Sequence, residues 1–295
     1  MTATLNIVGC GRLGKALGRA WQAQGDWTIR CVLNRSLPSG ERAVDFIGAG
    51  RAVASATDLD AADVTLIATG DAVIEATCRT LARAGVFESG QVVFHASGAI
   101  SSDTLDAARQ CGASVASAHP IKSFADPEAA SADLAGTWCG MEGDASALRV
   151  LRPAVEALGM HCLDIEPAAK TLYHAGASIA SNYLVTLVDS ALRCYELAGV
   201  PRDVGAEIVA TLIFGTASNV SRLGPAAALT GPVARGEVDI VAGHLDALDA
   251  ADADLAQLYR ALAIATLHLA RTQGTASEES LRALATLLAG PHRPL

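Results

Sequence analysis

The sequence has few aromatic residues and no excess of positive charge. Aromatic side chains make up 4% of the 295 residues, whereas 51% of the residues are hydrophobic and many of these are alanine. This composition suits closely packed helices better than a β-sandwich. The formal net charge of −9 argues against a surface that binds nucleic acid.

Cysteine motifs and targeting segments are also lacking. The seven cysteines are scattered singly, no CxxC pair occurs, and no histidine cluster has the spacing of a zinc site. Reduced thiols of this kind are typical of a cytosolic protein. The N-terminus shows no basic-plus-apolar signal, and polar residues interrupt every apolar run before it reaches about 20 residues. We therefore predict a cytoplasmic protein with no metal site, no nucleic-acid partner and no membrane span.

Short β-rich runs alternate with helical segments up to about residue 165. We expect strands at 5–9, 29–34, 64–68, 92–95, 114–118, 137–141 and 162–165. The helical segments between them are 13–24, 71–84, 102–110 and 145–157. This alternation predicts an α/β Rossmann domain with a mostly parallel, doubly wound sheet.

The strands stop after residue 165, and apolar residues then recur at a spacing near 3.6. The expected helices are 168–197, 202–222, 237–249, 252–271 and 278–288. We therefore expect two domains, a Rossmann domain over residues 1–165 and an all-α domain over residues 166–295.

A glycine motif opens the chain. The stretch LNIVGCGRLGKALGRAW places Gly9, Gly11 and Gly14 at GxGxxG spacing, where a strand passes into a helix. Such glycines provide a tight turn, room for a pyrophosphate and close contact between helix and sheet. The pyrophosphate would lie on the amides that begin the helix, at Arg12 and Leu13. A purely structural turn is the alternative, and the strands on either side favour dinucleotide binding.

The second strand ends in Asn34, Arg35 and Ser36. In this fold an acidic residue at that point contacts the adenosine ribose, whereas an arginine accommodates a 2′-phosphate. The trio therefore favours NADP(H) over NAD(H), with a solvated loop arginine as the alternative. We expect the next turn, at Thr69 and Gly70, to pass near the nicotinamide ribose.

The helix predicted at 168–197 carries polar side chains on an otherwise apolar face. Lys170 and His174 are four residues apart, and Ser178 and Asn182 fall near the same face. Burying such groups unpaired is costly, so this face predicts a site. Lys170 lies in the first helical turn, where the dipole lowers the pKa of a lysine and favours proton donation. We predict Lys170 and His174 as catalytic residues; a surface lysine and a core histidine are the alternative.

Substrate-binding candidates follow strands of the sheet. The texts FHASGAISSDTL and SAHPIKSFADPE come at carboxyl ends of strands, where ligands bind in such sheets. An arginine in the text TGPVARGE would pair with a substrate carboxylate in a bidentate fork, or would pin its own loop. The predicted substrate-binding residues are Ser97, His119, Asn182 and Arg235, with His95 and Lys122 as further candidates by position.

Together, the Rossmann start, NRS, HPIKSFAD, KTLYHAGA and TGPVARGE resemble one group over nearly the whole chain. These are the Rossmann-like predicted NADP oxidoreductases named by analogy to coenzyme F420-dependent enzymes. The group is similar to the 6-phosphogluconate dehydrogenase-like superfamily and includes an alternative type of ketopantoate reductase. In hydroxyacid dehydrogenases of that superfamily the helix lysine is followed four residues later by asparagine. Lys170 matches this lysine, whereas the later position is His174, so the resemblance leaves open which of the two handles the proton.

The resemblance implies an NADPH-dependent oxidoreductase that reduces a small 2-keto acid, with 2-dehydropantoate as the leading substrate. An imine reductase of the pyrroline-5-carboxylate reductase type and a non-catalytic NADPH-binding regulator are the alternatives. F420 is implied by the name of the group alone, and no residue favours a deazaflavin site. The resemblance also implies a homodimer built through the helical domain.

Overall fold

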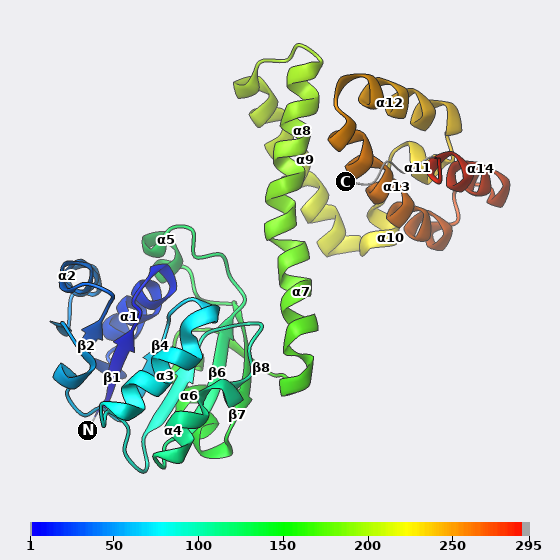
Figure 1. Cartoon of the computed structure of the whole chain (residues 1–295). Helices are drawn as coiled ribbons and strands as arrows, with labels where there is room; N and C mark the ends of the chain where they lie inside the picture. The colour runs from blue at the N-terminus through cyan, green and yellow to red at the C-terminus, as the bar shows by residue number, and fades with distance from the viewer. Residues whose placement is uncertain (1, 291–295) are drawn as a thin grey trace. The chain divides into compact units, whose positions relative to one another are not determined.

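The computed structural model describes residues 2–290, which divide into two compact units (Figure 1). The first unit ends at Asn182 and the second begins at Tyr183. The expected domain boundary at residue 165 stays a prediction. The helix α7 (Lys170–Ala180) lies in the first unit, where the side chain of Lys170 is buried.

The first unit contains one eight-stranded sheet with the order β3-β2-β1-β4-β5-β6-β7-β8. The strands are β1 (Ala3–Val8), β2 (Trp27–Leu33), β3 (Arg51–Val53), β4 (Val64–Ile67), β5 (Val92–His95), β6 (Ser114–Pro120), β7 (Trp138–Gly143) and β8 (His161–Asp164). All neighbouring strands pair in parallel except β6 and β7, so the mostly parallel sheet is confirmed. The strand order reverses at β1, so the turn after β1 lies at the switch point where such sheets bind ligands.

Helices cover this sheet and differ from the expectation in two places. They are α1 (Arg12–Gln24), α2 (Leu37–Ile47), α3 (Ile74–Arg83), α4 (Asp106–Gln110), α5 (Pro127–Ala132), α6 (Ala145–Glu156) and α7, with short 3-10 turns η1 (Ala56–Asp58), η2 (Asp71–Val73), η3 (Ser102–Leu105) and η4 (Pro167–Ala169). The sequence pattern did not predict α2, α5 or the strand β3.

The text LPSG explains why α2 resembles a turn in the sequence. Pro38 lies in the first helical turn, where its missing N–H is tolerated. Gly40 lets α2 approach β3 closely, because a Cβ at this position would lie 3.3 Å from the Cβ of Ala52. Pro38 and Gly40 suggest a loop in the sequence, but in the structure Pro38 begins the helix and Gly40 packs it against β3.

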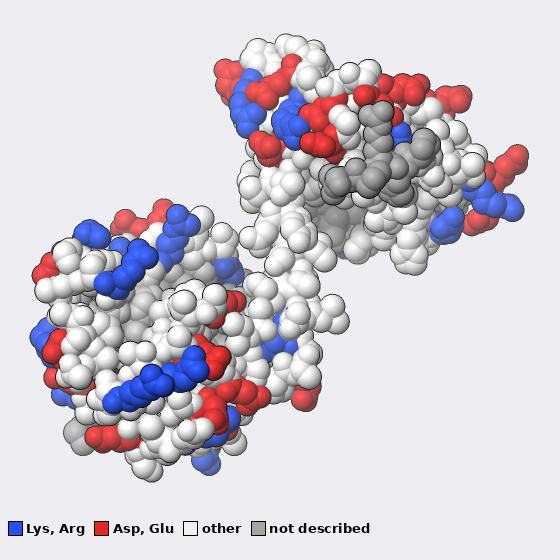
Figure 2. Space-filling view, viewed as in Figure 1, with Lys and Arg blue, Asp and Glu red and all other residues white. Residues whose placement is uncertain are grey.

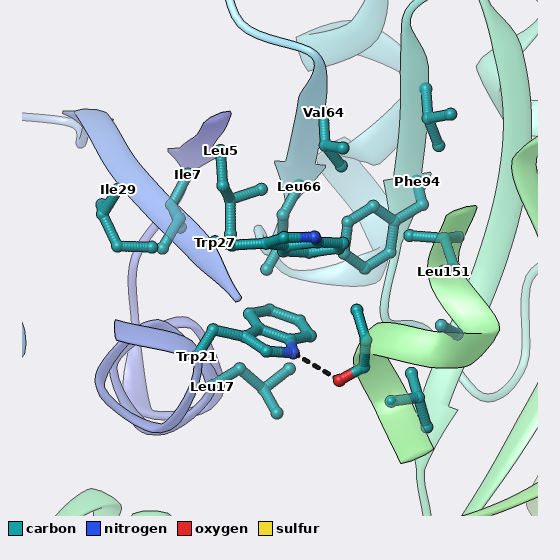
Figure 3. Packing of buried hydrophobic residues seen from close by; sticks show 14 of the residues in the cluster. Leu5, Ile7, Leu17, Trp21, Trp27, Ile29, Val64, Leu66, Phe94 and Leu151 are labelled. Carbon is teal, nitrogen blue, oxygen red and sulfur yellow. Dashed lines mark hydrogen bonds between the residues drawn. The ribbon is translucent and has the colours of Figure 1, made fainter. Parts of the chain in front are cut away.

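Three of the few aromatic residues gather on one face of the sheet (Figure 3). The rings of Trp21 and Trp27 lie 4.7 Å apart, and Phe94 meets both at a steep angle. The indole N–H of Trp21 donates to the carbonyl of Ala154 at 2.9 Å, so this buried donor is satisfied. The packing of Trp21 fixes α1, and with it the glycine turn at its start, against the sheet.

The second unit is helical, as the sequence predicts. Its helices are α8 (Asn182–Leu197), α9 (Arg202–Leu223), α10 (Pro225–Ala228), α11 (Pro232–Arg235), α12 (Val238–Ala251), α13 (Ala253–Gln273) and α14 (Glu278–Leu288). The single helix expected over 168–197 is interrupted at Ser181, which separates α7 from α8. A buried core holds this unit together, with Val241, Leu245, Leu267, Leu281 and Leu284 among its members.

The helices α8 and α9 leave most of their apolar side chains exposed. No residue of α8 is buried, and only Gly205 and Val209 are buried in α9. Figure 2 shows mostly uncharged side chains where α7 passes into α8. Within residues 2–290, α9 is by length and composition apolar enough to cross a membrane, although the sequence reading expected no such run. A helix that pairs with a second chain has the same composition, and the homodimer stays a prediction.

Candidate active site

The turn between β1 and α1 has the geometry that a bound pyrophosphate requires. Gly9 has a φ of +79°, and a Cβ there would lie 2.4 Å from Cγ2 of Thr69. At Gly11 the nearest atom to an added Cβ is 3.9 Å away, so the backbone surface is open to a ligand. Gly14 is buried, and a Cβ there would lie 3.3 Å from the Cβ of Ala68. The three glycines therefore take the three roles that their spacing predicts.

Unpartnered polar groups point to the same ligand. No side chain caps α1, so the first-turn amides of Arg12 and Leu13 are available to an anion. The hydroxyl Oγ1 of Thr69 is buried and has no hydrogen-bond partner within the described residues. A ribose or phosphate oxygen would satisfy it. These residues fit a dinucleotide.

The side chain of Asn34 is hydrogen-bonded within the cofactor site. Its Oδ1 accepts from the amide of Cys10 at 2.6 Å, and its Nδ2 donates to the carbonyl of Ser39 at 3.0 Å. The amide group is therefore occupied in joining the glycine turn to the start of α2. Asn34 therefore shapes the cofactor site, and its contact with the ribose stays a prediction.

Arg35 and Ser36 line a pocket of about 480 Å³ next to the glycine turn. The other lining residues are Gly9, Cys10, Gly11, Asn34, Ser39, Arg42, Ala68, Thr69 and Gly70. Arg42 is a second cation that sequence reasoning missed, because the helix α2 that carries it was not predicted. Two arginines and two serines give the pocket the chemistry of a phosphate site.

We expect Arg35→Ala to raise KM for NADPH by roughly 10–100-fold, since hydrogen bonds to charged groups contribute about 1.5–3 kcal/mol. Arg42→Ala should act in the same direction. KM for NADH should change little in both variants, because NADH lacks the 2′-phosphate. Steady-state kinetics with both nucleotides measures this, with Arg83→Ala, an exposed arginine outside the pocket, as control. Equal increases for NADPH and NADH would contradict the assignment.

A second cluster lies where β6, β7 and α7 meet. His119, near the end of β6, bonds through Nδ1 to the hydroxyl of Tyr173 at 3.0 Å. The backbone of Gly140 in β7 lies close to the same hydroxyl and acts to lower its pKa. A Cβ at Gly140 would lie 2.4 Å from the Tyr173 oxygen, so only glycine leaves room for this arrangement. Tyr173 was not predicted as a site residue, although it follows Lys170 by three residues and so lies near the same face of the helix.

Burial sets the protonation of this pair. It lowers the pKa of His119 to about 4, and the nearby His174 and Lys170 act in the same direction. It also raises the pKa of Tyr173 to about 12. At neutral pH the imidazole is therefore neutral and the phenol protonated. A phenol that donates its proton to Nδ1 leaves the histidine proton on Nε2.

His174 lies beside His119, with ring centroids 5.7 Å apart. Its Nδ1 is buried and has no partner within the described residues. A Cβ at Gly98 would lie 2.6 Å from this nitrogen and 2.7 Å from Cε1 of His119, so the glycine makes room for both rings. His174 therefore lies beside His119 and the turn after β5, and its predicted catalytic role stays a prediction.

Lys170 is almost fully buried, with 2% of its surface exposed. Its Nζ donates to the carbonyl of Ser97 at 3.0 Å and to Oγ of Ser117 at 2.6 Å, and lies 3.7 Å from Oε1 of Glu142. Burial lowers the pKa of Lys170, and Glu142 opposes this shift. With two hydrogen bonds and a carboxylate beside it, the ammonium is placed to hold the strand ends together, and its role as proton donor stays a prediction.

The remaining candidate residues differ in their contacts and burial. His95 is buried, with its ring nitrogens bonded to backbone atoms of Ser97 and Ser101. Lys122 pairs with Asp133 at 2.9 Å, and Arg235, in the second unit, forms a fork with Glu237 at 2.8 and 2.9 Å. Ser97 donates its hydroxyl to Asp71 at 2.9 Å, while Asn182 is exposed at the start of α8. Of the predicted substrate-binding residues, His119 and Ser97 lie in the cluster.

Comparisons with known proteins agree with this architecture. Residues 2–120 match the Rossmann-like domain family, and residues 137–266 match a domain of unknown function, DUF2520. No curated protein matches the sequence. The Rossmann-like match covers the glycine turn and the pocket beside it.

Several solved structures have the same fold. A Thermotoga maritima protein is 26% identical, with a TM-score of 0.70, covering 91% of this chain and 99% of its own. A Bacteroides fragilis protein described as an NADP oxidoreductase is 18% identical, with a TM-score of 0.76 and coverages of 90% and 97%. The Plasmodium falciparum pyrroline carboxylate reductase, solved with NADP bound, is 11% identical, with a TM-score of 0.60 and coverages of 96% and 98%. These comparisons show that the chain shares its fold with these proteins.

Proposed function

We propose that this chain, which combines a Rossmann-like domain with a DUF2520 domain and has the fold of the 6-phosphogluconate dehydrogenase-like oxidoreductases, is an NADPH-dependent reductase of a small 2-keto acid. The leading substrate is 2-dehydropantoate. The observation that carries the proposal is the hydrogen bond between His119 and Tyr173 at the carboxyl end of β6. It prepares a proton donor at the edge of the sheet where ligands of this fold bind.

The cofactor would be held by the first turn of α1, by Thr69, and by Arg35 and Arg42 around its 2′-phosphate. NADPH supplies the hydride that the carbonyl carbon receives. The chain aligns the two reactants and supplies the proton.

His119 would protonate the carbonyl oxygen through Nε2, which makes no hydrogen bond within the described residues. As the C=O bond becomes a C–O bond, the oxygen takes the Nε2 proton and Nδ1 takes the proton of Tyr173. The resulting tyrosinate is stabilised by the Gly140 backbone and then regains a proton from water. A phenol whose pKa is about 12 is a stronger acid than the alcohol produced, so the transfer is downhill.

A cyclic imine is the second candidate, and the likeness to a pyrroline carboxylate reductase favours it. A protonated imine accepts hydride and becomes a neutral amine without a further proton. The proton transfer from Tyr173 through His119, called the relay below, would then not be needed. A carbonyl substrate is the stronger proposal because it does need this proton.

The proposal is tested by incubating the purified protein with NADPH and a panel of 2-keto acids and cyclic imines while following nicotinamide absorbance. We expect turnover with small 2-keto acids and a kcat/KM at least tenfold lower with imines. Faster reduction of imines would favour the second candidate. Binding of NADPH without turnover of any compound would favour a regulator.

A further inference from the structure

Glu142 is a buried carboxylate that the reaction described above does not use. It lies in β7 with 4% of its surface exposed, and its partner Lys170 is 2% exposed. A buried ion pair of this kind contributes little net stability, because removing two charges from water offsets their attraction. Its presence in a site therefore calls for a role other than stability.

Glu142 and Lys170 hold the two ends of one segment, residues 97–102. Glu142 accepts from the amide of Ser102 through Oε1 and from its hydroxyl through Oε2, both at 2.7 Å. Lys170 donates to the carbonyl of Ser97 at 3.0 Å, and Ser117 donates to the same carbonyl at 3.1 Å. The segment is thus fixed to β6, β7 and α7 by buried, charge-assisted hydrogen bonds.

The segment held in this way contacts both imidazole rings. A Cβ at Gly98 would lie 2.6 Å from Nδ1 of His174 and 2.7 Å from Cε1 of His119. A small displacement of Gly98 would therefore move the rings or open a gap beside them. Glu142 touches neither ring, and any effect on His119 passes through the segment.

We propose that Glu142 is a positioning residue for the reduction: with Lys170 it clamps residues 97–102 and so fixes the place of His119. The expected loss of kcat rests on the proposed reductase function. The expected displacement of residues 97–102 rests on the geometry alone. An aligned donor is what the reaction requires, because small misplacements of catalytic groups are costly in rate.

The test is a comparison of Glu142→Gln, Lys170→Met and the double variant Glu142→Met/Lys170→Met. Each single change leaves one buried charge unpaired and should lower Tm, whereas the double variant removes both charges and should recover Tm. We expect kcat to stay at least tenfold below wild type in the double variant, with KM for NADPH within about twofold. A purely structural ion pair would instead recover kcat together with Tm, and that result would overturn the proposal.

A second readout does not depend on activity. With histidine ring carbons labelled, wild type should show a nuclear Overhauser contact between the Gly98 α-protons and Hε1 of His119, and the double variant should lose it. Loss of this contact in a protein that reduces no tested compound would uphold the clamp and refute the reductase. An unchanged contact would refute the clamp. Should the double variant fail to fold, the same nuclear Overhauser contact is measured in Glu142→Gln. The control is Arg152→Met, which removes the ion pair to Asp164 in the same unit.

Discussion

Replacing His119 by glutamine is expected to lower kcat by about 10²–10⁴-fold, the usual contribution of a positioned acid or base. Glutamine fills similar space and can still hydrogen-bond, but it cannot pass a proton from one side of the side chain to the other. Binding of NADPH should stay near the wild-type value, because His119 does not line the pocket beside the glycine turn. Stopped-flow measurement of the hydride step, with NADPH affinity measured separately, tests this.

Tyr173→Phe isolates the second half of the relay. It removes the hydroxyl that bonds to His119 while keeping the ring, so the fold should be retained and kcat should fall, as for His119→Gln. Tyr195→Phe, in the second unit, is the matched control. Full turnover in Tyr173→Phe would mean that the imidazole is protonated by another route and would remove the relay from the mechanism.

The polar face of α7 shows what sequence periodicity can predict. Lys170 and His174 are four residues apart, and both indeed face the carboxyl ends of the strands. Periodicity predicts that the side chains share a face of the helix. Because burying an unpaired polar group costs free energy, it also predicts that these side chains have polar partners. Periodicity does not identify the partners of Lys170, which come from the turn after β5, from β6 and from β7, between 28 and 73 residues earlier in the chain.

The partners depend on the one antiparallel step in the sheet. Pairing of β6 with β7 places Ser117 opposite Glu142 and His119 opposite Gly140. A strand–helix alternation predicts parallel strands and gives no register for a reversed one. Glu142 and Gly140 could therefore not be recognised as site residues from the text WCGMEG, although the strand itself could be predicted.

The cofactor side was more predictable because its signals are local. Gly9, Gly11 and Gly14 act within one turn, and their spacing alone states their roles. The hydrogen bond between Asn34 and Cys10 could not be predicted, because Cys10 lies 24 residues away on the neighbouring strand end. Arg42 was missed because the text LPSG resembles a turn, whereas Pro38 lies in the first turn of α2 and Gly40 packs this helix against β3.

Lowering the pH from 7 to 4.5 should destabilise the protein through His95. Burial lowers the pKa of His95 to about 4 from the ordinary value of 6.5, with the charge of Lys170 acting in the same direction. Between pH 4 and pH 6.5 this histidine is protonated in the unfolded chain and neutral in the native protein. The unfolded state therefore binds more protons, and the free energy of unfolding rises with pH. The contribution is complete above pH 6.5 and is lost as the pH falls toward 4.

At about 1.4 kcal/mol per pKa unit, this histidine alone should lower the free energy of unfolding by roughly 2–3 kcal/mol at pH 4.5. Urea unfolding of wild type and His95→Gln at both pH values measures it, because the variant has no group to titrate there and should show a correspondingly smaller pH dependence. His268→Gln, at an exposed histidine, is the control. If wild type and His95→Gln lose the same free energy between pH 7 and 4.5, then His95 is protonated in the native state and the segment around Ser97 and Ser101 is open to water.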